Sequence, residues 1–185
     1  DGTYDALIDK LRDAEIDLIV GALRPEFAIQ GLQQETLFTD GLAVVVRAGH
    51  PLTMRKKLMW HHLADAQWIM PMPNTPAQTV FERTLACAGL PLPVAQLRVN
   101  SALMMQSMLM QSDRLAMMSP RQIQSEIQAG LLVVLPLAVP EAVRTIGLIR
   151  RSGILLTPGM QALLEACRQV TSEMVGENPL NKPNA

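Results

Sequence analysis

Four stretches of the sequence place a hydroxyl or amide residue where a predicted strand gives way to a predicted helix. They are Thr3, Asn74-Thr75, Asn100-Ser101 and Ser119-Pro120. Capping of the helix, worth about 1 kcal/mol each, is the simpler interpretation for any one of them. In an open α/β sheet, however, helix starts gather where ligands bind, and their N–H groups attract anions. Their number therefore favours a receptor for a small acid.

Catalytic and metal-binding chemistry have little support in the sequence. It contains no GxxxxGK[ST], GxGxxG, GxSxG or HExxH motif. His61 and His62 are adjacent, so on a helix they point about 100° apart, and no carboxylate or cysteine stands at ligand spacing. Asp113, with Arg114 and Arg121, supplies the charged groups near the proposed site, and surface ion pairing is their expected role. We predict no enzyme, no metal and no cofactor.

The elements that would position these residues alternate between helix and strand, which is typical of an α/β fold. A Pro-rich segment, 71–76, separates two such stretches and is interpreted as a boundary. The expected helices are 4–15, 75–88, 101–111, 120–129 and 157–175, and the expected strands are 16–21, 32–37, 42–47, 94–99, 115–118, 132–135 and 143–150.

Composition and charge restrict the class of protein. The chain has 185 residues, of which 49% are hydrophobic, and it is long enough to bury a core without disulfides or metals. A net charge of −1, with 16 Lys and Arg against 17 Asp and Glu, argues against binding nucleic acid through its own surface. No apolar stretch approaches the length of a membrane span. Cys87 and Cys167 stand among apolar residues without a metal or redox spacing, which predicts buried, reduced thiols.

Six methionines crowd into a short part of the second stretch, between residues 104 and 118. Packing in the core is their simplest role. Because the thioether side chain is flexible and polarisable, a methionine-rich wall beside a cleft would also suit the apolar part of a ligand or a subunit contact.

The order and spacing of short motifs resemble the effector-binding domain of LysR-type transcriptional regulators. No single motif is diagnostic, but together they cover nearly the whole chain except its tail. In chain order they are Gly2-Thr3, Leu11-Arg12, Ile16 to Gly21, Gly31-Leu32, Glu35 to Leu37, Val44 to Arg47, Gly49 to Leu52, Trp68 to Pro71, Asn100-Ser101, Ser112 to Ser119, Gly130 to Leu132 and Ile146 to Arg150.

The resemblance implies a periplasmic-binding-protein-like (type 2) effector domain. Such a domain is α/β, with two Rossmann-like lobes joined by two crossover strands and a ligand cleft between the lobes. Lobe I would be residues 1–70 and 145–175, lobe II residues 71–144, and residues 176–185 a mobile C-terminal tail. The family's N-terminal helix-turn-helix, and the first strand and helix of its effector domain, have no counterpart in this sequence, so we expect a longer native protein.

The resemblance also implies a function and a set of contacts. The chain would be the ligand-sensing and oligomerisation domain of a cytoplasmic bacterial regulator, a homodimer or homotetramer that reaches DNA only through the missing domain and no membrane. Helix 75–88 and strand 32–37 are the expected interface elements. An extracytoplasmic solute-binding protein of the same architecture is the alternative. The effector, expected to be a carboxylate, would contact Thr3, Asn74, Thr75, Asn100, Ser101, Ser119 and Pro120.

Overall fold

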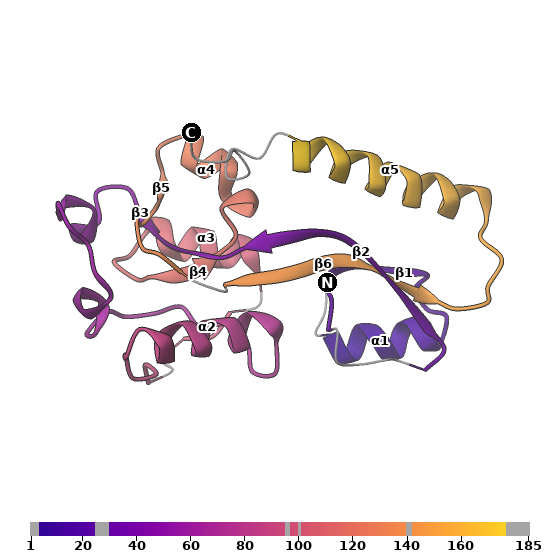
Figure 1. The fold of residues 1–185 in the computed structure, drawn as a ribbon, viewed down its shortest axis with the longest axis horizontal. Coiled ribbons are helices and arrows are strands. Elements are labelled where there is room, and N and C mark those ends of the chain that lie inside the picture. The colour runs from indigo at the N-terminus through magenta and orange to yellow at the C-terminus, as the bar shows by residue number, and fades with distance from the viewer. Residues whose placement is uncertain (1–3, 25–29, 95–96, 100, 140–141, 177–185) are drawn as a thin grey trace. The chain divides into compact units, whose positions relative to one another are not determined.

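The computed structural model divides the chain into two compact units (Figure 1). Unit 1 combines Asp1–Thr39 with Thr145–Ala185, and unit 2 is the continuous segment Asp40–Arg144. The chain therefore enters unit 2 once and leaves it once. The residues that the structure describes are 4–24, 30–94, 97–99, 101–139 and 142–176.

Unit 1 contains a three-stranded sheet in the order β1-β6-β2. These strands are β1 (Leu18–Ala22), β6 (Val143–Arg151) and β2 (Leu32–Gly41). Strand β1 runs antiparallel to β6. Helices α1 (Tyr4–Arg12) and α5 (Pro158–Gly176) lie on opposite sides of these strands in Figure 1.

The core of unit 1 forms because α1 is amphipathic and turns one face to the sheet. Its buried residues Ile8 and Leu11 pack against Ile19, Leu23 and Ile149.

The sheet of unit 1 also requires glycine at one position. A Cβ atom on Gly147 would collide with the backbone carbonyl of Glu35 on β2 and would come within 2.7 Å of Leu23 Cδ1. Any larger residue in β6 at this point would push the strands apart.

Unit 2 is built on a second sheet, with strand β3 (Ala43–Arg47) between β4 (Ala116–Met118) and β5 (Leu132–Val134). Both neighbours pair antiparallel with β3. Two isolated parallel bridges extend this sheet beyond β4. Trp68 pairs with Leu115, just before β4, and Met70 pairs with Arg98.

Alternation along the strands of unit 2 divides its core between two faces. Val44 and Val46 belong to one cluster with Phe81 of α2, whereas Val45 belongs to the other with Leu109 of α3. Each helix therefore covers one face of the sheet. The helical segments of unit 2 are η1 (Pro51–Met54), η2 (Trp60–Leu63), α2 (Pro76–Cys87), α3 (Ala102–Met110), η3 (Pro120–Ile123) and α4 (Gln124–Gln128).

The structure differs from the sequence-based description in several places. The division placed at residues 70 and 71 falls inside unit 2, because β3 pairs with β4 and β5 and the Pro-rich segment only links a bridge at Met70 to α2. The helix expected at 120–129 is a 3₁₀ turn followed by α4, since Ile123 has non-helical dihedrals. Cys87 is exposed and Cys167 is partly exposed, whereas both were expected to be buried.

The remaining parts of the described chain add two facts. None of its helices is long and apolar enough to cross a membrane. The tail expected at 176–185 lies, apart from the last residue of α5, outside the described residues.

Candidate functional site

Three of the predicted site residues follow the ends of parallel segments in unit 2. The segments at 68–70, 98 and 115–118 run in the same direction, because their bridges are parallel. The helical segments that follow them begin after Thr75, Ser101 and Ser119. Since the carboxyl ends of parallel strands meet at one edge of a sheet, these residues share an edge, which we call the helix-start edge.

The hydroxyl groups of Thr75 and Ser101 both cap helices, but only one has a donor to spare. Thr75 Oγ1 accepts from the backbone N–H of Gln78 (3.2 Å) and donates to the carbonyl of Met72 (2.8 Å). Its hydroxyl hydrogen is therefore already engaged within the chain. Ser101 is exposed, and its Oγ accepts from the N–H of Met104 (3.3 Å). No described residue accepts the Ser101 hydroxyl hydrogen.

The other predicted contacts are placed less directly. Asn74 adopts a left-handed backbone (φ 59°), and its N–H donates to Gln78 Oε1 (2.6 Å), which fixes the turn before α2. Pro120 occupies the first turn of η3. Thr3 and Asn100 lie outside the described residues.

Ser119 differs from the other caps because it is completely buried. Its Oγ accepts from the N–H of Arg121 (3.2 Å) and donates to Asp40 Oδ1 (2.6 Å). The other carboxylate oxygen of Asp40 receives two bonds from Arg144, from Nε (3.0 Å) and Nη2 (2.8 Å). The three residues Asp40, Ser119 and Arg144 form what we call the clasp.

The sequence analysis did not find Asp40 or Arg144, although both lie on the helix-start edge. Asp40 precedes β3, whose first residue Ala43 stands opposite Met118, the last residue of β4. Asp40 is the next-to-last residue of β2 and Arg144 is the second residue of β6, and 104 positions separate them. The signal that could have found them is an acidic residue directly before a buried strand, which needs a buried partner.

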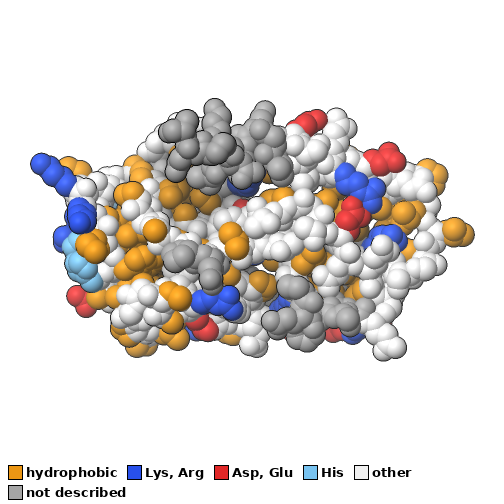
Figure 2. All heavy atoms as spheres, in the orientation of Figure 1, with side chains coloured by type: hydrophobic (Ala, Val, Ile, Leu, Met, Phe, Trp, Pro, Cys, Tyr) orange, Lys and Arg blue, Asp and Glu red, His pale blue; other side chains and the backbone are white. Residues whose placement is uncertain are grey.

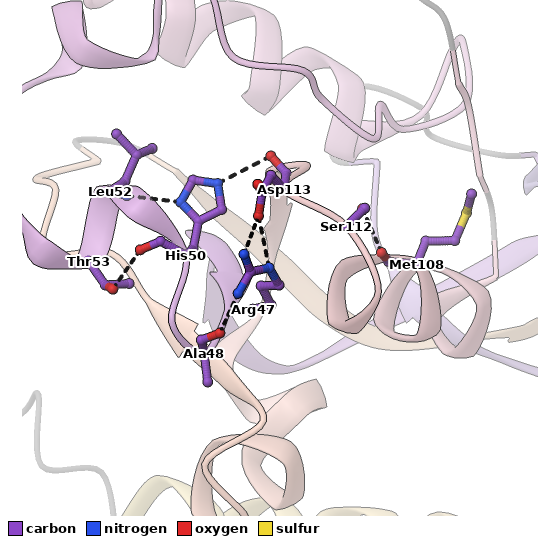
Figure 3. Close-up of polar contacts among 8 residues, drawn as sticks. All are labelled: Arg47, Ala48, His50, Leu52, Thr53, Met108, Ser112 and Asp113. Atoms are coloured by element: carbon purple, nitrogen blue, oxygen red, sulfur yellow. Dashed lines mark hydrogen bonds and ion pairs between the residues drawn. The ribbon is translucent and has the colours of Figure 1, made fainter.

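The opposite edge of the same sheet carries another charged cluster, made of Arg47, His50 and Asp113 (Figure 3). Arg47 Nε and Nη2 donate to Asp113 Oδ1 at 2.8 and 2.6 Å. His50 Nδ1 accepts from the N–H of Leu52, so its Nε2 carries the proton that the Asp113 carbonyl accepts at 3.2 Å. The prediction that Asp113 makes an ion pair is confirmed. Asp113 was also expected to lie near the helix starts, and this is wrong. Asp113 precedes the first residue of β4, whereas Ser119 follows the last one, so the two residues lie at opposite ends of this strand.

A pocket of about 580 Å³ borders this cluster, and its lining includes His50, His62, Asp65, Asp113 and Arg114. Partial desolvation lowers the pKa of His62 below its ordinary value, and the nearby positive charges of His61 and Arg55 lower it further. Figure 2 shows histidine and Lys or Arg side chains next to each other on the left of the view. Within the described ranges, no three His, Cys, Asp or Glu side chains are arranged to hold a metal ion.

The fold and this edge define a class of protein. A continuous α/β unit inserted into a discontinuous one, with helix starts on one sheet edge, is the architecture of two-lobed periplasmic-binding-protein-like domains. Residues 1–172 match the family model of the LysR substrate binding domain, and the chain belongs to this family.

Known proteins agree with this assignment. The regulator GalR of Pseudomonas putida, an HTH-type transcriptional regulator, is 36% identical over 170 residues, which are 92% of this chain and 43% of GalR. The chain spans about half the length of the curated relatives it matches.

Solved structures show the same fold. The effector-binding domain of QuiR in complex with shikimate has a TM-score of 0.73, with 17% identity over 93% of this chain and 79% of that chain. The BenM effector-binding domain with benzoate has a TM-score of 0.67, with 22% identity over 100% of this chain and 82% of that chain.

Proposed function

We propose that this chain is the ligand-sensing and oligomerisation domain of a LysR-type bacterial transcriptional regulator. The family membership and the names of its relatives support a regulator over a solute-binding protein. A small effector binds at the helix-start edge of unit 2. Its binding shifts the population of domain states, and the rest of the native chain reports that shift to DNA. The shift in this equilibrium can be no larger than the difference in the effector's affinity for the two states.

The observation that carries this proposal is the exposed hydroxyl of Ser101. It stands at the N-terminus of α3, its oxygen caps the helix, and its hydrogen has no acceptor among the described residues. A carboxylate oxygen would accept this hydrogen and would also interact favourably with the positive end of the helix dipole. The effector is therefore a carboxylate, and shikimate and benzoate, bound by two neighbours in fold, are carboxylates.

Two apolar side chains in the first turn of α3 define the rest of the effector. Leu103 and Met104 are 73% and 55% exposed, directly after the Ser101 cap. Covering them removes apolar surface from water, which contributes roughly 25 cal/mol per Å². A carboxylate with an apolar ring or chain fits this combination better than a small inorganic anion does.

The proposal includes a cytoplasmic regulator that acts as a homodimer or homotetramer. Light scattering on the native chain measures the oligomeric state, and a monomer at all concentrations would contradict this part of the proposal. No catalytic step is assigned to the domain.

The decisive experiment is calorimetric titration of the chain with shikimate, with benzoate and with a wider panel of ring-bearing and aliphatic carboxylates. Ser101→Gly removes the hydroxyl but costs the cap only a few tenths of a kcal/mol, so it separates binding from stability. Loss of one charge-assisted hydrogen bond predicts about tenfold weaker binding or more. Ser107→Gly, on the same helix, is the control for backbone flexibility, since Ser107 Oγ donates to the Leu103 carbonyl within α3.

Two results would contradict the proposal. Equal affinity in Ser101→Gly and the unmodified chain would remove Ser101 from the site. Absence of binding by every carboxylate in the panel would refute a carboxylate effector.

A further inference from the structure

The clasp joins the place where the chain enters unit 2 to the place where it leaves that unit. Asp40 is the first residue of that unit and Arg144 the last. Their ion pair is buried, with side-chain exposures of 5% for Asp40 and 17% for Arg144. Beside it, the N–H of Leu42 donates to the carbonyl of Ala142 at 2.6 Å. Strands β2 and β6 are thus fastened to each other where they pass from one unit to the other.

Ser119 fastens the same point to a helix start. Its hydroxyl donates to Asp40 Oδ1, and its oxygen also caps η3 by accepting from the N–H of Arg121. A buried carboxylate needs all its partners, because in a region of low dielectric an unpaired oxygen is costly. A change at the start of η3 therefore alters the hydrogen bonding of Asp40, and through Asp40 that of Arg144.

A second path connects the clasp to α3, which carries the proposed effector contact. Arg144 Nη2 donates to Gln122 Oε1 at 3.3 Å. The backbone carbonyl of Gln122 accepts from the side-chain amide of Gln106 at 3.0 Å. Gln106 is a buried residue of α3, whose first turn is capped by Ser101. A continuous set of hydrogen bonds therefore runs from α3 to both crossover strands.

We propose that Asp40, Ser119 and Arg144 are positioning residues that transmit the ligand-dependent state of the helix-start edge to both crossover strands at once. This inference rests on the proposed function, since it names how binding at that edge is relayed. Contiguity alone does not establish coupling, so the test measures coupling directly.

The first test needs no ligand. Amide hydrogen exchange is measured on the full chain and on Ser119→Ala, in peptides covering the end of β2 and the start of β6. The Ser119 hydroxyl donates to Asp40 and not to Arg144, so the peptide from Ala142 to Gly147 is decisive. We expect about tenfold faster exchange there, corresponding to a more frequent local opening.

The controls use the other sheet edge and a conservative variant. Asp113→Asn breaks an Arg–Asp pair of the same sheet and should leave exchange in β6 unchanged. Arg144→Lys keeps the charge but loses the two-pronged bond to Asp40, and should accelerate exchange at Ser119 and in η3. Arg144→Lys also replaces Ser119→Ala as the test variant if Ser119→Ala fails to fold. Changes confined to each substituted element in both clasp variants would overturn the proposal.

The second test adds shikimate or benzoate at saturation, whichever the titration shows to bind. In the unmodified chain the ligand should slow exchange in both crossover strands. In Arg144→Lys it should slow exchange near α3 only, and equal slowing of both strands would refute the clasp. If no carboxylate binds, the proposed function fails, and the ligand-free exchange experiment still decides whether the clasp couples the two strands.

Discussion

Strand β3 lies between two Arg–Asp pairs that have almost the same geometry and very different surroundings. Asp40 and Arg144 meet at 2.8 Å on the helix-start edge, and Arg47 and Asp113 meet at 2.6 Å on the opposite edge. The Asp40 side chain is 5% exposed, whereas that of Asp113 is 59% exposed. Bond length therefore does not separate a structural clasp from a surface pair. Burial does, since water screens the second pair and competes for its hydrogen bonds.

The largest effect is expected from breaking the buried pair. Asp40→Asn leaves the Arg144 guanidinium in a poorly solvated place without its counter-charge. Loss of one partner of a buried pair costs about 3–5 kcal/mol. Urea unfolding followed by circular dichroism measures this loss. A cost below about 1 kcal/mol would show that the two edges are energetically alike.

A smaller effect is expected from the hydroxyl that holds the same carboxylate. Ser119→Ala removes the cap of η3 and one of the donors to Asp40, which together predict a loss of about 1–2 kcal/mol. Ser101→Ala removes an exposed cap and should cost about 1 kcal/mol or less in the same urea experiment. An equal cost for the two variants would contradict the distinction between buried and exposed caps.

The exposed pair of the opposite edge should contribute little. Asp113→Asn is expected to reduce the free energy of unfolding by less than about 1 kcal/mol, because the carboxylate is largely solvated. The difference from the unmodified chain should shrink further in high salt, which screens exposed charges. Urea unfolding at low and high ionic strength checks both statements, and a large, salt-independent loss would place Asp113 among the structural residues.

A third pair, Glu35 with Arg168 in unit 1, should give the smallest effect. The hydrogen bond from Arg168 lowers the pKa of Glu35 below its ordinary value of 4.5, although burial opposes this. Because the folded-state pKa is the lower one, the pair stabilises the fold above pH 4.5, and this is lost as the pH falls through the folded value.

The variant Glu35→Gln tests the predicted direction of this pH dependence. The variant should be slightly less stable than the unmodified chain at pH 7, and the two should converge as the solution is acidified below pH 4.5. Urea unfolding over a pH series measures the difference. A difference that grows on acidification would contradict the direction of the pKa shift.

Local sequence signals predicted the parts of the fold that local interactions determine. The caps Thr75, Ser101 and Ser119 were identifiable because a hydroxyl before a helix satisfies backbone N–H groups within three residues. The motif resemblance supplied the family and the two-unit architecture, both of which are confirmed.

Features that depend on distant residues were not predictable in this way. Asp40 and Arg144 meet only after unit 2 has folded, and the residues next to either one do not indicate that the other is its partner. The unit boundary was misplaced for the same reason. The Pro-rich segment at 71–76 ends a strand locally, but membership of a unit is decided by the pairing of β3 with β4 and β5. The effector contacts stay a prediction.

The insertion of unit 2 into unit 1 has a consequence for synthesis of the chain. Strand β6, the middle strand of the unit 1 sheet, follows every strand of the unit 2 sheet in the sequence. When the chain emerges from the ribosome, every strand of unit 2 is therefore available before the sheet of unit 1 has its centre. Domains fold as units during synthesis, so we expect unit 2 to fold first. Strands β1 and β2 lack their shared neighbour until β6 has been synthesised.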